Sequence, residues 1–463
     1  MRRKDIAARI LGFLVTLLGT GWLAVQSPRV QTGIAEKALA SLEEGLDARI
    51  QAGSISIEPA NSFTLKNVVI LDENPYSSAN PVDTFAVIGS LSGKIMLRSL
   101  LGNGGVHLDR LSMQDAMMHL TIEPDSSCRN GTNTNLERIF GIEESDFEGY
   151  VATPDVFEIG KVEIKGLHFL MTSYTSPYTA PKGAVNWSDL DLTANMSARK
   201  LKLTGGKMSG IVDALDATDK CGYGIRRFTG RVRAGMGKAT LEKIRFTDSW
   251  SDIRFPLFSM GWENYHTDFS DFINKIRMEL SVESGTLDAR SIHALGGIPE
   301  TPVALEMGKS HAKGYVNDLQ IDRLRFTEPS SGIAADLSAT LTGIPDIQNL
   351  LTDVKVGNLT FTTSGLQRLL AKFGVKADLS GMAPGRVFSF SGSAKGPLGN
   401  LKANGSLGSK IGRAAFSLGI RNLTDARRPL ELRGTVDTHN LGLGELLSVK
   451  EIGEVTAETG FRA

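Results

Sequence analysis

The segment Phe63-Thr-Leu-Lys-Asn-Val-Val-Ile70 contains the pattern that best indicates the fold class. Its apolar residues occupy positions one, three, six and eight of an eight-residue phrase. In a β-strand, positions one and three point to one face, and so do positions six and eight. The three-residue step between the pairs interrupts this period of two. A bulge or sharp bend at the step would restore the alternation, and the pattern therefore predicts a strand that is irregular near its centre.

The same phrase recurs along the chain. Further copies are Val106–Met113, Val162–Phe169, Leu319–Phe326 and Val354–Phe361, with a looser one at Ala239–Phe246. We expect the irregularity at the Asp-Arg, Lys-Gly or Gly-Asn step of each copy. A strand unit repeated in this way predicts an elongated structure built by addition of strands. The alternative is chance similarity among strands, because the spacing between copies is irregular.

Other segments also alternate as strands do. Residues 275–283 place apolar side chains on one face and Lys275, Arg277, Glu279 and Glu283 on the other, which predicts a sheet with one dry and one wet face. The 50 glycines and 16 prolines supply frequent turns, as in mainly β proteins. Helical spacing is confined to short stretches. These contain Leu136, Ile139 and Phe140; Ile344, Ile347, Leu350 and Leu351; and Leu366, Leu369, Leu370 and Phe373.

The N-terminus predicts a membrane anchor. Arg2, Arg3 and Lys4 precede the apolar segment 10–25, and no charge occurs between Arg9 and Arg29. The uncharged stretch is close to the ~20 residues that cross a bilayer. Residues 1–28 are therefore expected to form a cytoplasmic tip and a single transmembrane helix, with the bulk of the chain exported. A cleavable signal peptide is the alternative, but Leu23-Ala24-Val25-Gln26 is a poor cleavage site.

The remainder divides into three predicted parts. Residues 29–48 place Ile34, Ala38, Leu39, Leu42 and Leu46 on one helical face, which predicts an amphipathic helix next to the membrane. Residues 49–340 form the repeated strand region. Residues 341–463 combine short helices with further strands. This last part ends at Phe461-Arg-Ala without a capping element, so we expect a longer chain or a partner there.

Composition and motifs argue against several function classes. The chain has 51 basic and 51 acidic residues, which leaves no basic field for nucleic acid. Gly308-Lys309-Ser310 resembles the end of a phosphate-binding loop, but Val303 stands where the first glycine of that motif belongs. The seven scattered histidines show no metal-ligand spacing. We therefore predict no enzyme, no catalytic residue, no cofactor and no metal site, while a glycosidase pair assembled from distant carboxylates stays open. A bond between Cys128 and Cys221 also stays open.

The N-terminal anchor, the repeated strand unit and the glycine-rich β body together resemble the TamB branch of the AsmA-like proteins, as found in Bacteroidota-type bacteria. The resemblance covers most of the chain, but its motifs are not chemical signatures. The matching segments are Ser27–Gln31, Ile55–Ile57, Phe63–Asp72, Leu136–Phe140, Thr267–Phe272 and Leu341–Asp346. The resemblance implies a β-taco, an open β-groove lined with apolar side chains. Typical members are longer and end in a domain that meets an outer-membrane partner; we expect a longer chain or another subunit to supply that domain here.

The function implied by the resemblance is phospholipid transport from the inner membrane across the periplasm toward the outer membrane. The partners expected are membrane phospholipid, the inner membrane and an outer-membrane protein of the Omp85 type. Two alternatives are a scaffold in outer-membrane protein assembly with that partner, and a closed β-sandwich that serves as a structural or adhesive module. The lipid-facing residues expected are Val162, Ile164, Leu167, Phe169, Ile276, Met278, Leu280 and Val282.

Overall fold

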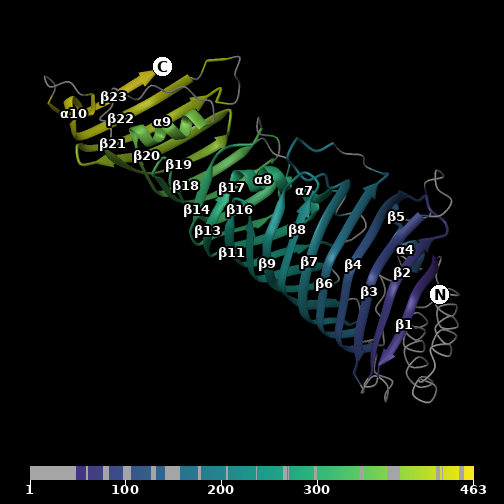
Figure 1. Cartoon of the computed structure of the whole chain (residues 1–463). Coiled ribbons are helices and arrows are strands. Elements are labelled where there is room, and N and C mark those ends of the chain that lie inside the picture. Colours follow the sequence, from purple (N-terminus) through teal and green to yellow (C-terminus); the bar gives the residue numbers. More distant parts are fainter. Residues whose placement is uncertain are drawn as a thin grey trace. The chain divides into compact units, whose positions relative to one another are not determined.

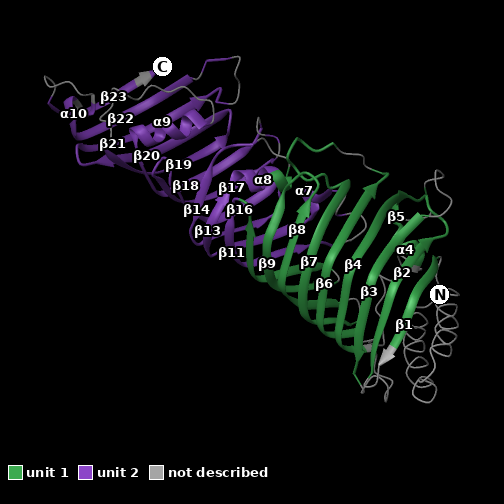
Figure 2. Cartoon of the chain, viewed as in Figure 1, with its two compact units in different colours: residues 1–249, 294–297 green, residues 250–293, 298–463 purple. Residues whose placement is uncertain are grey.

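The computed structural model describes residues 48–58, 61–76, 83–96, 106–126, 132–140, 157–175, 179–204, 207–235, 237–263, 268, 271–296, 300–344, 346, 349–372, 386–423, 428–429, 431–447 and 453–462. These residues form 23 β-strands and five short helices, which confirms the prediction of a mainly β protein (Figure 1). The chain divides into two compact units. Unit 1 runs to Ser249 and includes Ala294–Gly297, and unit 2 comprises Trp250–His293 and Ile298–Ala463 (Figure 2).

Unit 1 is a sheet of long strands joined mostly in chain order. The strands pair in the order β1, β2, β3, β4, β6, β7, β8, β9 and β10, and all these pairs are antiparallel except β4 with β6. The parallel pair needs a crossover connection, and short strand β5 and helix α4 lie within it. The elements are β1 Ala48–Glu58, β2 Ser62–Asp72, β3 Asp83–Ile95, β4 Val106–Pro124, β5 Thr132–Thr134, α4 Asn135–Phe140, β6 Phe157–Ser173, β7 Asp189–Thr204, β8 Lys207–Asp219, β9 Gly224–Gly235 and β10 Lys238–Asp248.

Unit 2 is also antiparallel. Strand β11 pairs with both β12 and β13, strand β16 pairs with both β14 and β15, and β16 to β23 follow one another in chain order. The elements are β11 Asp252–Gly261, α7 Phe272–Lys275, β12 Arg277–Val282, β13 Ser284–Asp288, α8 Ala289–Gly296, β14 Ala304–Met307, β15 Ser310–Gly314, β16 Asp318–Glu328, β17 Ile333–Thr342, β18 Leu351–Thr362, α9 Thr363–Lys372, β19 Val387–Pro397, β20 Asn400–Ser409, β21 Gly412–Arg421, β22 Glu431–Gly442, α10 Leu443–Leu447 and β23 Glu454–Arg462.

The irregularities predicted for the repeated phrase are present. The pairing register shifts at Lys165-Gly166 in β6, at Asp322-Arg323 in β16 and at Gly357-Asn358 in β18. It also shifts beside Asp109 in β4 and between Glu242 and Arg245 in β10. In the first copy the irregular residue is Asn67, which has a φ of 51°, while the pairs on either side keep their register. Each strand thus returns its apolar residues to one face after the three-residue step.

One face of unit 1 carries the core. Phe63, Ile95, Leu108, Ile159 and Val162 form one buried cluster. Val68, Ile88 and Ala116 form a second, and Leu65 packs against both. Positions one, three, six and eight of the first phrase therefore all point to the same apolar face, as the pattern predicts.

Some predicted boundaries were wrong. The strand expected at 275–283 is shorter, because Lys275 ends α7 and Ile276 is the residue that links α7 to β12. Leu351, expected in a helix, begins β18. The helices predicted around Leu136 and Leu366 are confirmed as α4 and α9. The anchor at 1–28, all but the last residue of the amphipathic helix at 29–48, and Cys128 lie outside the described residues, and Ala48 begins β1. Among the described residues no helix has the length and apolar character needed to cross a membrane.

Gly166 offers a direct test of the bulge in β6. It has a φ of 64°, and a Cβ at this position would lie 3.0 Å from Oδ1 of Asp115. We expect Gly166→Ala to destabilise β6 by about 1–2 kcal/mol because alanine is strained at this φ. Gly357→Ala is the matched control, since Gly357 occupies a bulge in β18 and its added Cβ would meet only Asp336 O at 3.4 Å. Hydrogen exchange should show faster opening of β6 in the first variant and little change of β18 in the second; equal effects would contradict this explanation.

Candidate functional site

The apolar face of unit 1 carries an unbroken row of large apolar side chains. Each residue in the row is the direct cross-strand partner of the next, and one comes from each of nine strands. All of them are half-buried, so they are neither sealed in a core nor fully exposed. We call this row the unit 1 ladder; it consists of Ile55, Leu65, Leu91, Met113, Ile164, Met196, Leu215, Phe228 and Phe246.

Unit 2 has a corresponding row, called the unit 2 ladder. It also contains no polar or charged side chain, and each member is again the registered partner of the next. Ala339 is buried and the others are half-buried. The members are Phe258, Leu280, Ala312, Ile321, Ala339, Val354, Ala394, Ala403, Leu418 and Gly434.

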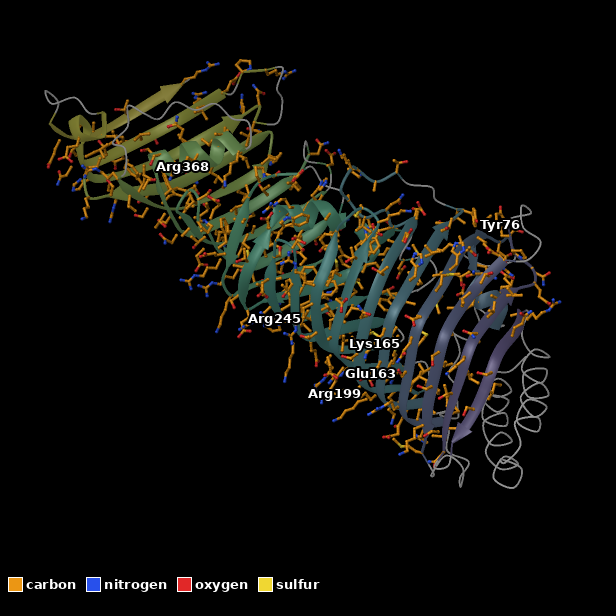
Figure 3. The ribbon with its side chains drawn as sticks, viewed as in Figure 1. Tyr76, Glu163, Lys165, Arg199, Arg245 and Arg368 are labelled. Atoms are coloured by element: carbon orange, nitrogen blue, oxygen red, sulfur yellow. The ribbon has the colours of Figure 1, made fainter. Side chains whose placement is uncertain are left out.

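The residues one step along each strand form polar rows on the opposite face. In unit 2 this row is Ser259, Glu279, Lys313, Gln320, Thr340, Asp353, Lys395, Lys402, Gly419 and Arg433. In unit 1 the polar row covers six of the nine strands and consists of Ser56, Thr64, Ser92, Ser112, Glu163 and Ser197. Glu163, Lys165 and Arg199 project away from the ribbon in Figure 3. In each unit the two faces of the sheet therefore differ sharply in chemistry.

The unit 1 residues predicted from the repeat fall on the apolar face. Ile164 is a member of the ladder, and Leu167 lies beyond the bulge and packs against the Val68 cluster. Val162 is buried at 5 % exposure in the cluster that contains Phe63, while Phe169 is half-buried. Sequence reasoning missed Met196, Leu215 and Phe228, which lie outside the repeated phrase and are brought into line only by cross-strand pairing.

The four residues predicted in unit 2 do not all share one environment. Met278 and Leu280 are half-buried on β12, and Leu280 is a ladder member between Phe258 and Ala312. Val282 is buried at 8 % exposure. Ile276 is fully buried and precedes the strand, so it packs in the interior.

Helix α4 is fixed to the apolar face of unit 1 at one end of the strands. Ile139 is fully buried against Phe85 and Ala86. Arg138 donates to both carboxylate oxygens of buried Asp72 at 2.6 and 2.8 Å, and also to Glu123 at 3.2 Å. Burial alone would lower the pKa of Arg138, but the two carboxylates outweigh it and raise that pKa. This ion cluster gave no signal in the sequence, because its three members are far apart along the chain.

Helix α9 of unit 2 is held by a second buried carboxylate. Glu328 is 2 % exposed and accepts hydrogen bonds from Nζ of Lys372 at 3.0 Å, Oγ of Ser330 at 2.6 Å and the amide of Ser331 at 2.7 Å. Arg368 of the same helix donates to the carbonyl of Ser330 at 3.2 Å. These contacts fix α9 beside the turn between β16 and β17, at the ends of the strands.

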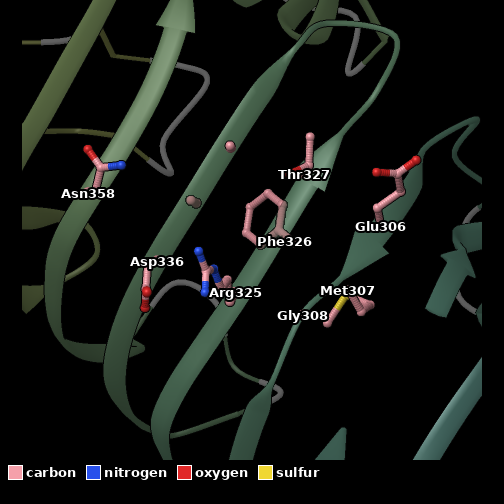
Figure 4. Close-up of a pocket in the computed structure, with 10 residues that line it drawn as sticks. Glu306, Met307, Gly308, Arg325, Phe326, Thr327, Asp336 and Asn358 are labelled. Atoms are coloured by element: carbon pink, nitrogen blue, oxygen red, sulfur yellow. The ribbon is translucent and has the colours of Figure 1, made fainter. Parts of the chain in front are cut away.

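A hollow of about 360 Å³ lies along β14, β16, β17 and β18 (Figure 4). Its lining includes Glu306, Arg325, Thr327, Asp336 and Asn358. Asp336 is held by Arg323, which donates to it through Nε at 3.1 Å. With so many polar groups in its lining, this hollow does not suit an acyl chain.

The titratable groups suggest structural roles. Burial and the hydrogen bond to Asp248, 2.8 Å long, raise the pKa of Tyr223 well above its ordinary value. Cys221 is a free, half-buried thiol whose pKa is raised first by burial. Within the described ranges, no group of three His, Cys, Asp or Glu side chains could hold a metal ion.

Comparison of the chain with protein-family models, curated proteins and solved structures finds no match. The two ladders themselves must therefore carry any functional argument.

The Glu328 contacts predict a pH dependence of the β16–β17 turn. Burial alone would raise the pKa of Glu328, but the hydrogen bonds from Ser330, Ser331 and Lys372 outweigh it and lower the pKa from 4.5 to about 2. A depressed pKa means that the stabilisation is present above pH 4.5 and is lost as the pH falls toward 2, and it amounts to roughly 3 kcal/mol. Hydrogen exchange at the Ser331 amide should show this loss. Glu328→Gln removes the charge, so it should weaken protection of the amide already at pH 7 and remove the pH dependence; an unchanged profile would show that the carboxylate is not the cause.

Proposed function

We propose that the apolar faces of the two units form open grooves that carry phospholipid, with the acyl chains lying along the unit 1 and unit 2 ladders. The observation that supports this proposal is that a row of half-buried apolar side chains runs across nine neighbouring strands without a polar interruption. At roughly 4.8 Å between strands, the unit 1 ladder extends over roughly 40 Å.

The energetics favour a path of this kind for lipid. Each methylene that passes into water costs about 0.8 kcal/mol, so an exposed acyl chain faces a large barrier to crossing an aqueous compartment. A continuous apolar row lowers that barrier at every point along its length. Such transport needs no covalent step, and the proposed function is not enzymatic.

The burial of the ladders favours an open groove over a closed β-sandwich. In a sandwich, facing sheets interdigitate and their inward side chains are sealed from water. Most ladder residues instead keep partial exposure, whereas Val162 and Ile159 near the unit 1 ladder are buried. A bound acyl chain would cover what these side chains still expose.

We further propose that the chain belongs to the TamB branch of the AsmA-like proteins and is anchored in the inner membrane through residues 10–25, with its bulk in the periplasm. The resemblance in the N-terminal segment and the recurrent strand phrase support this assignment. An outer-membrane partner of the Omp85 type remains part of the same proposal.

Photo-crosslinking tests whether the ladders contact lipid. A photoreactive residue at Leu280 or Ile164 should capture phospholipid in cells, because both side chains lie on a ladder. The same residue at neighbouring Glu279 or Glu163 should not, because these side chains belong to the polar rows. Mass spectrometry of the adducts provides the readout. Crosslinks from Leu280 and Ile164 to adjacent strands alone would favour a closed core.

Leu280→Lys separates the open groove from a closed core. In an open groove the lysine can extend its amine toward water, so the free energy of unfolding should change by less than about 1 kcal/mol. Photo-crosslinking of lipid at Ile321 should nevertheless decrease in Leu280→Lys, because a charge in the path must be desolvated as acyl chains pass. Leu280→Met is the control and should preserve both properties. A decrease in the free energy of unfolding of about 3 kcal/mol or more in Leu280→Lys would indicate a buried core instead.

A further inference from the structure

Three large apolar side chains lie exposed together at one edge of unit 1, where β6 begins, β7 ends and β8 begins. Phe157 is 38 % exposed, and Leu203 and Met208 are each 47 % exposed. Leu203 is the direct cross-strand partner of both Phe157 and Met208, so the three form one contiguous row. Single exposed apolar residues are ordinary, but a contiguous group indicates an interaction surface.

This row is an extension of the apolar face to the edge of the sheet. Phe157 is two residues from buried Ile159, and Leu203 is two residues from Leu201, which packs on the cluster containing Ile159. Residues two apart on a strand point to the same side. We call the group of Phe157, Leu203 and Met208 the apolar rim.

Exposed cations lie at the same strand ends, and those next to a rim residue in sequence, Lys202 and Lys207, point to the opposite face. Lys200, Lys202, Lys207, Arg233 and Lys238 are all exposed. Two half-buried carboxylates lie among them: Glu158 pairs with Lys202 at 2.9 Å, and Glu242 pairs with Arg233 at 3.0 Å. Lys207 and Lys238 have no carboxylate partner in the described part of the chain. With exposed Asp109 on neighbouring β4 included, five cations against three carboxylates leave this edge with a positive excess.

We infer that the apolar rim docks on the surface of a bilayer that contains anionic phospholipid. Apolar side chains that enter the boundary between headgroups and acyl chains, beside lysines that extend toward lipid phosphates, are the combination that an anionic membrane surface binds. A second copy of this edge would bring like charges together, which disfavours self-association. The inference goes beyond lipid carriage because it identifies an edge at which unit 1 meets a membrane.

Vesicle flotation tests the inference with the full chain held in phosphatidylcholine nanodiscs. Residues 10–25 can then insert into the nanodisc, so their insertion into the vesicles does not contribute to flotation. The nanodiscs are mixed at low salt with vesicles of phosphatidylcholine and phosphatidylglycerol at a ratio of 7:3, or of phosphatidylcholine alone. We expect flotation with the anionic vesicles and much less with the neutral ones. Leu203→Asp/Met208→Asp should weaken it about tenfold, because apolar insertion is lost and negative charge is added.

Matched variants separate docking from damage to the fold. Lys207→Gln/Lys238→Gln leaves the two ion pairs intact and should also weaken flotation on anionic vesicles about tenfold. Leu351→Asp/Val387→Asp replaces two residues of unit 2 that are 50 % and 60 % exposed, and should change flotation less than twofold. Circular dichroism checks that each variant is folded.

Three results would overturn the inference: no flotation of the wild-type chain on anionic vesicles, equal loss in the unit 2 control, or a vesicle-independent dimer abolished by Leu203→Asp/Met208→Asp. Crosslinking of lipid at Leu280 is measured separately. Crosslinking of lipid without docking on vesicles would contradict membrane docking by the apolar rim and support the lipid groove. Docking without lipid crosslinking would support membrane docking and contradict the groove.

Discussion

Cross-strand register is the constraint on which both units depend. A strand has a side-chain period of two, and a slip of one residue would turn every apolar side chain to the wrong face. The repeated phrase contains a three-residue step that would by itself cause this slip. Bulges at Lys165-Gly166, Asp322-Arg323 and Gly357-Asn358 absorb the extra residue in three of the copies. Because each of these strands restores its alternation within itself, the next strand can pair with it and the apolar rows stay aligned.

The strand ends are stabilised by a different interaction. Asp72, Glu123 and Glu328 are buried carboxylates, and each binds a cation from a short helix. A buried charge is costly unless it is paired and fully hydrogen-bonded, so these contacts allow little freedom in the position of α4 or α9. Both units contain such an ion pair, and in each unit it lies at the strand ends and not on the ladder. The charged groups that hold the helices therefore do not interrupt either ladder.

The proposed function follows from what the ladders lack as well as from what they contain. Transfer of an acyl chain needs apolar contact along the whole path, and one desolvated charge would interrupt it. Nearly all ladder side chains are half-buried, which is compatible with a surface that a lipid completes. The polar rows one residue away show how local this separation is, since Leu280 and Glu279 are neighbours in sequence and belong to opposite faces.

Local periodicity in the sequence was enough to predict the mainly β class, the position of the irregular step within the strands and the helices around Leu136 and Leu366. It also placed Ile164 and Leu280 on apolar faces. It did not predict that Ile276 would be fully buried beside α7, that Leu351 would begin a strand, or that Met196, Leu215 and Phe228 would extend the unit 1 ladder. Nor did it predict the cluster of Arg138 with Asp72 and Glu123. These features depend on long-range pairing, because periodicity specifies which side of a strand a residue occupies, whereas hydrogen-bonded pairing specifies which distant residue lies beside it.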